Sequence, residues 1–146
     1  MALAATITVG SAFTGIAVPI AASVSGVGAG FAVYASAART ATPDGQEFEL
    51  PRRARAGRFV VDVTAKTASP SVVFTISGVD RTSGKTYPLF TSAAVTSTGT
   101  TVLKVDSALA AATNVAKDTL PPVIRIQAVH GNSDSITYSV SGLVTG

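Results

Sequence analysis

The chain contains no cysteine and no tryptophan, and it has a single histidine among its 146 residues. Without cysteine there is no disulfide bond, thiolate metal site or cysteine nucleophile. The one imidazole, His130, has no G-x-S-x-G nucleophile motif to serve as a base. The 8 acidic residues are dispersed, without the spacing of metal ligands or of paired glycosidase carboxylates. We therefore expect no enzymatic activity, no cofactor and no metal.

Charge is also scarce. Charged residues make up 13% of the chain and hydrophobic residues 47%, whereas about 25% of an ordinary soluble domain is charged. The 11 basic and 8 acidic residues leave a net charge of +3, which is a small excess beside that of nucleic-acid-binding surfaces. Few charges remain to keep copies of the molecule apart. The composition favours a protein that assembles into an oligomer or lattice, and nucleic acid is not an expected partner.

The scarcity is greatest at residues 1–38, which carry no charged side chain. Ala35-Ser36-Ala37 resembles a signal-peptide cleavage site, but a basic start is missing and the apolar stretch is too long. Residues 12–35 are long enough to cross a bilayer, but glycines and a proline interrupt them and no basic residue precedes them. Processing and a membrane span are therefore the less favoured interpretations of this segment.

Short strands fit the segment better. Residues 5–9 alternate threonine with β-branched residues, residues 13–20 continue the pattern, and a glycine-rich break at 26–30 precedes residues 31–34. An uncharged arm of this kind has to pair its backbone and cover its apolar side chains, either on its own domain or on a neighbouring subunit. The side chains expected to make these contacts are Ile7, Val9, Phe13, Ile16, Val18 and Phe31.

Residues 39–57 concentrate charge, with two prolines and two glycines, and are predicted to form an exposed loop or hinge. Three arginines in this segment, Arg52, Arg53 and Arg55, are candidates for binding phosphate or an acidic patch on a partner protein. The simpler interpretation is a solvated loop whose positive charge is partly neutralised by Glu47 and Glu49. No aromatic residue lies between the arginines, which disfavours single-stranded nucleic acid.

Residues 58–146 show the period-two pattern of strands with one buried and one exposed face. Phe59 begins the first such run, and a polar turn at 78–84 predicts a hairpin. Residues 107–116 are the only stretch with helix propensity and allow one or two turns. The inward side chains expected on the later strands are Val72, Phe74, Ile76, Leu103, Val105, Ile124, Ile126, Ala128, Ile136, Tyr138 and Val140. The predicted fold is all-β, an antiparallel β-sandwich of jelly-roll or immunoglobulin-like type behind an extended uncharged N-terminal arm.

Two runs of sequence carry a resemblance to a known group of proteins. VVFTISGVDRTSGKTYPLFTSAAVTSTGTTVLKV at 72–105 and DSITYSVSG at 134–142 resemble small structural proteins of tailed bacteriophages, among them capsid decoration and minor head proteins. The resemblance covers about residues 39–142 and leaves the uncharged arm largely unmatched. It implies a β-sandwich on the virion, bound in many copies to the major capsid protein, commonly as a trimer or other small homo-oligomer.

The expected function is therefore that of a capsid decoration subunit that stabilises the shell. Because the arm departs from the family pattern, a tail or head–tail connector protein is an alternative. A carbohydrate-binding or receptor-binding tail module is another, although the absence of tryptophan counts against a sugar site. A membrane-anchored protein is the third and least favoured alternative.

Overall fold

The computed structural model describes residues 21–146, and within them it contains ten strands and no helix. The strands predicted at residues 5–9 and 13–20 lie outside the described residues. The ten strands are β1 (Ala22–Ser23), β2 (Gly30–Arg39), β3 (Gln46–Glu49), β4 (Ala56–Lys66), β5 (Val72–Val79), β6 (Thr86–Thr91), β7 (Gly99–Val105), β8 (Val115–Ala116), β9 (Val123–His130) and β10 (Ile136–Thr145).

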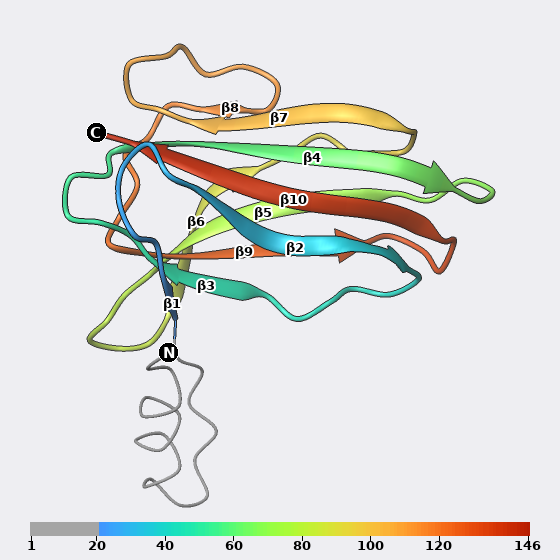
Figure 1. Cartoon of the computed structure of the whole chain (residues 1–146), viewed down its shortest axis with the longest axis horizontal. Coiled ribbons are helices and arrows are strands. Elements are labelled where there is room, and N and C mark those ends of the chain that lie inside the picture. The colour runs from blue at the N-terminus through green and yellow to red at the C-terminus, as the bar shows by residue number, and fades with distance from the viewer. Residues whose placement is uncertain (1–20) are drawn as a thin grey trace, which may run out of the picture.

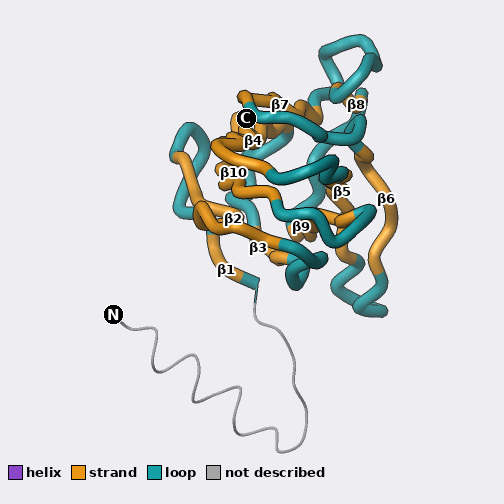
Figure 2. Tube along the Cα trace, turned by 90° about the vertical axis from the view of Figure 1, so that its right-hand side faces the viewer, coloured by secondary structure: helices purple, strands orange, loops and turns teal. Residues whose placement is uncertain are grey.

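The strands form two five-stranded sheets that pack face to face, and Figure 2 shows them as two layers. Sheet A has the order β1-β3-β9-β5-β6, and sheet B has the order β2-β10-β4-β7-β8. All pairings are antiparallel except for two short parallel ones, β1 with β3 and β7 with β8. The predicted β-sandwich is therefore confirmed, and each sheet ends in one short parallel pairing.

The strand order distinguishes between the two expected sandwich types. Without the two-residue strands, the sheets read β2-β10-β4-β7 and β3-β9-β5-β6. The chain passes from one sheet to the other at almost every step, and only the β5–β6 hairpin joins sequence neighbours among these eight strands. This is the order of a jelly roll, in which two Greek keys are wound together. An immunoglobulin-like sandwich instead keeps more consecutive strands side by side.

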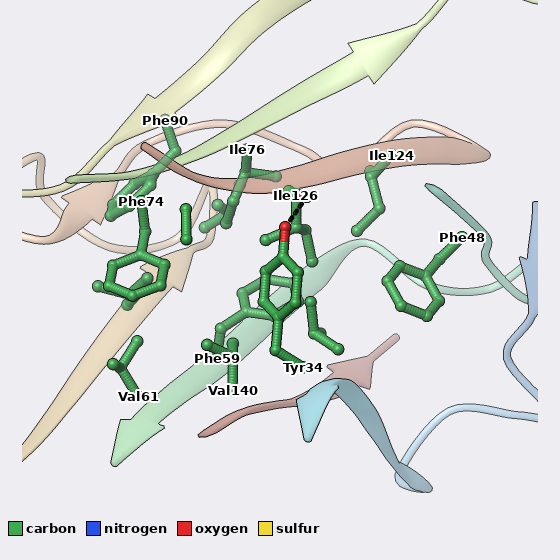
Figure 3. Close-up of a cluster of buried hydrophobic side chains, with 14 of the residues drawn as sticks. Tyr34, Phe48, Phe59, Val61, Phe74, Ile76, Phe90, Ile124, Ile126 and Val140 are labelled. Atoms are coloured by element: carbon green, nitrogen blue, oxygen red, sulfur yellow. Dashed lines mark hydrogen bonds between the residues drawn. The ribbon is translucent and has the colours of Figure 1, made fainter. Parts of the chain in front are cut away.

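The core lies between the sheets and follows from the alternation in the sequence (Figure 3). In β4, Phe59, Val61 and Val63 are buried, whereas Arg58 and Asp62 point to solvent. The same alternation gives buried side chains on β5, β9 and β10, as predicted. Because hydrophobic burial is the main favourable term in folding, these inner faces hold the sheets together.

The boundary that the charge pattern suggested at residue 38 falls inside a strand. β2 runs from Gly30 to Arg39 and pairs with β10, so these residues belong to the sandwich. Two register shifts in that pairing bring the adjacent residues Val33 and Tyr34 into the core together. The outward residues of β2 are alanine and serine rather than charged. The last uncharged residues before Arg39 therefore belong to the sandwich domain and not to a separate arm.

Two other segments differ from their predicted conformation. The loop or hinge expected at 39–57 contains β3, which pairs with β9 and buries Phe48. The stretch 107–116 forms turns and contains the two-residue strand β8, and no helical turn is present there. Asp106 Oδ1 accepts a hydrogen bond from the Ala108 amide, and such side-chain bonds stabilise turns over helix. So short a run also cannot offset the cost of helix nucleation.

Candidate functional site

The residues predicted to contact a partner fall into three groups. Five of them, Ile7, Val9, Phe13, Ile16 and Val18, lie outside the described residues. Phe31 lies on β2, and its ring centroid is 4.9 Å from that of Phe48 and 6.3 Å from that of Phe59. Because β2 belongs to sheet B, this ring packs against the protein's own core, which is one of the two positions expected for the side chains of the arm. The arginines form the third group.

Two of the three arginines line a groove at one end of the sandwich, the left end in Figure 1. The groove has a volume of about 660 Å³. The loop after β3 contributes Arg52 and Arg55, the β5–β6 loop contributes Arg81, and the residues following β1 contribute Val24. Arg53 is exposed but does not line it. We call this feature the arginine groove; its lining is Ser23, Val24, Glu49, Leu50, Pro51, Arg52, Ala54, Arg55, Arg81 and Pro122.

Backbone hydrogen bonds fix the walls of the arginine groove. The Val24 amide donates to the Glu49 carbonyl at 2.9 Å, and the Leu50 amide donates to the Pro122 carbonyl at 2.8 Å. The Arg55 amide donates to the Thr145 carbonyl at 2.8 Å. The loop is thereby tied to three segments that are distant in sequence. A site on such a frame needs little ordering when a ligand binds.

The guanidinium groups of the groove differ in what holds them. Arg55 Nη1 donates to the Arg52 carbonyl at 2.9 Å and to the Ala54 carbonyl at 3.2 Å, so its position is set by its own loop. Arg81 forms an ion pair with Glu49, in which both side chains are about half exposed. Arg52 is exposed and forms no ion pair within residues 21–146. Three guanidinium groups therefore share the groove with one carboxylate.

The chemistry available in the arginine groove is anion binding. Guanidinium groups stay protonated at all physiological pH values and present hydrogen-bond donors in a planar fork. That geometry suits carboxylate and phosphate groups. Among the described residues, no cluster of three or more His, Asp or Glu side chains could hold a metal ion.

The sequence identified Arg52 and Arg55 but missed Arg81 and Glu49 as members of the same site. Arg81 lies in a polar turn that the sequence predicted only as a hairpin connection. It reaches the groove because β5 and β3 both end at this end of the sandwich (Figure 1). No local pattern around Arg81 signals that proximity, since it depends on the order of strands in sheet A.

A second polar cluster, also missed, surrounds Tyr138 at the opposite end. Nε2 of His130 lies 3.0 Å from the Tyr138 hydroxyl, and the Arg39 guanidinium stacks over the Tyr138 ring at 4.5 Å from its centroid. Burial raises the pKa of Tyr138 to about 12. Burial, followed by the nearby Arg39 charge, lowers the pKa of His130. Arg39 Nη1 also donates to the Tyr138 carbonyl at 2.9 Å. The cluster closes this end of the core.

This cluster predicts how stability depends on pH. Because the pKa of His130 is lower in the folded protein, the unfolded chain takes up a proton first as the pH falls through about 6.5. Stability should therefore fall with acidification below that pH until the folded-state pKa is reached, and His130 should add no pH dependence above it. Urea unfolding of the wild type and of His130→Gln at several pH values tests this. An unchanged pH profile in the variant would contradict it.

No helix within the described residues is long and apolar enough to cross a membrane. No family model, curated protein or solved structure matches the chain.

Proposed function

We propose that this chain is a structural virion protein, a capsid decoration or minor head protein that binds the major capsid shell in many copies and stabilises it. Its jelly-roll strand order supports this proposal, since the fold is common in viral capsid domains. The same fold also occurs in lectins and cupins. A fold shared by proteins of unrelated function does not specify one function, whereas the surfaces of the molecule do.

The observation that carries the proposal is the convergence of two contact features at one end of the molecule. Ser23 and Val24, which follow the uncharged residues 1–20, line the arginine groove together with Arg52 and Arg55. The first described residues after the charge-free segment thus form part of the lining of a basic groove. One end of the sandwich can then attach to a shell through apolar contacts, strand pairing and ionic contacts at the same time.

The outer face of sheet B also suits close packing between subunits. The register aligns Ala32, Ser141, Val60 and Val102 in a row across four strands. None of these side chains is charged, and Val102 is 38% exposed. This neutral row is a strip that another copy can cover, between the outward-pointing Arg58 and Asp62 of β4. This supports assembly as a small homo-oligomer, for which we propose a trimer.

The proposal predicts that removing residues 1–20 abolishes attachment to the shell. Among residues 21–146, the core side chains lie between Val24 and Val144, so the shortened chain should keep this core while losing the apolar contacts of the uncharged segment. Co-sedimentation of full-length and shortened protein with empty capsid shells measures the effect, with urea unfolding as the control for folding. Undiminished binding of the shortened protein would count against the proposal.

The same sedimentation experiment separates the head from the tail. Saturable binding to empty shells supports a decoration protein, whereas binding to purified tail tubes alone supports a tail or connector subunit. A glycan array tests the carbohydrate-binding alternative. Specific hits there, together with no binding to either particle, would overturn the structural proposal.

A further inference from the structure

The charge and shape of the arginine groove indicate the chemistry of its ligand. We infer that it binds an acidic, extended peptide segment of the virion protein on which this chain assembles. The identity of that partner rests on the proposed function, whereas the recognition of an acidic peptide follows from the groove itself. The inference adds a ligand class and a set of binding residues to the proposed attachment surface.

The arginine groove carries a surplus of positive charge. Glu49 neutralises the charge of Arg81 in an ion pair, and the backbone carbonyls of the loop hold the Arg55 guanidinium in place. Arg52 is left with an exposed guanidinium that forms no ion pair among the described residues. A carboxylate can accept two parallel hydrogen bonds from such a group. An incoming acidic side chain would therefore pair with Arg52 and gain attraction from Arg55 nearby.

Apolar residues lie between the arginines in the lining of the groove. Val24, Leu50 and Ala54 contribute apolar atoms to the lining, and Pro51 and Pro122 flank them. An acidic peptide with interspersed apolar side chains can bury these against the lining while its carboxylates meet the guanidinium groups. An isolated inorganic anion would leave the apolar surface unused. The lining thus favours a peptide over a free ion.

The lining of the arginine groove favours a peptide over nucleic acid as its ligand. Single-stranded nucleic acid is usually held by aromatic side chains on which bases stack, and none of the described residues that line the arginine groove is aromatic. The chain's own residues 1–20 contain no acidic side chain, so charge does not direct them to the arginines. An acidic segment of another protein remains the ligand that matches both charge and lining.

A peptide-binding experiment tests the inference on the full-length chain. The probe is a fluorescein-labelled peptide of alternating glutamate and leucine, and its glutamine–leucine counterpart is the uncharged control. We expect saturable binding of the acidic probe, with affinity that falls as salt is raised. Arg52→Glu should weaken binding by about tenfold, because it places a carboxylate opposite the probe. Arg81→Glu should act in the same direction.

Arg53→Glu is the matched control, because it changes the charge by the same amount at the next position of the same loop. Arg53 is exposed and does not line the groove, so it should change affinity by less than about twofold. Equal losses in Arg52→Glu and Arg53→Glu would overturn the inference, since they would indicate a general charge effect. Arg52→Gln, with an unchanged urea midpoint, excludes misfolding as the cause.

Competition for the groove and binding to empty shells provide two further tests. Displacement of the probe by millimolar inorganic phosphate, or tighter binding of oligo-dT than of the peptide, would overturn the peptide assignment. Shell binding that survives Arg52→Glu leaves the proposed function standing and refutes the groove as its acidic contact. Peptide binding that depends on Arg52 in a protein without affinity for shells supports the groove and refutes the proposed function.

Discussion

Replacing Phe59 with alanine is expected to lower the free energy of unfolding by about 3–5 kcal/mol. Phe59 is fully buried on the inner face of β4. Its neighbours in sheet B are Leu103 and Gly142, and the Phe31 ring meets it edge-on. The cavity left by the ring would be enclosed by packed strands that cannot collapse into it. Since a domain of this size has only about 5–15 kcal/mol of net stability, the variant should be close to unfolding.

Urea unfolding followed by circular dichroism measures this loss. The control is Val60→Ala at the next position of β4, which points outward and is only partly buried; its effect should be about 1 kcal/mol or less. If the two variants lost similar stability, the assignment of the two faces of β4 would be wrong.

Replacing Gly142 with alanine is expected to cost about 1–3 kcal/mol through overpacking. Gly142 pairs with Phe31 across sheet B, and an added Cβ would overlap the Phe31 ring. That ring cannot easily move, because it lies against Phe48 and Phe59. Gly142 does not have a positive φ angle, so the effect comes from lost space and not from backbone strain.

A second glycine provides the control for this prediction. Gly78 pairs with Tyr87, and an added Cβ would likewise overlap the tyrosine ring. Tyr87 is 42% exposed, however, and can rotate into solvent. Gly78→Ala should therefore cost less than about 1 kcal/mol. Adding Phe31→Leu to Gly142→Ala should recover part of the lost stability. A double-mutant cycle that shows no coupling between the two substitutions would contradict the proposed overlap.

Much of the sandwich was predictable because burial and exposure alternate residue by residue. In β4, β5 and β10, the predicted inward side chains include Phe59, Ile76 and Tyr138, and all three are fully buried. The turn between β5 and β6 was also predictable, since the two strands are adjacent in both sequence and sheet. Local patterns sufficed wherever a strand is long, regular and flanked by turn residues.

Other features depend on contacts between distant residues. The alternation of β2 is broken where Val33 and Tyr34 are buried together, because the bulges that cause this arise from pairing with β10. β3 is only four residues long, which is too short for its pattern to separate it from a charged loop. The arginine groove likewise unites Arg52 with Arg81 through the strand order. Sequence periodicity carries no information about that order.

The position of β10 has a consequence for synthesis of the protein. This last strand lies between β2 and β4 and pairs with both of them over most of its length. During translation, β2 and β4 emerge long before the strand that joins them. A ribosome that stops early would release a chain in which sheet B is split and the inner face of β4 is exposed. Only a chain translated through Thr145 can complete the sandwich, so aborted products would be left out of any assembly that selects folded subunits.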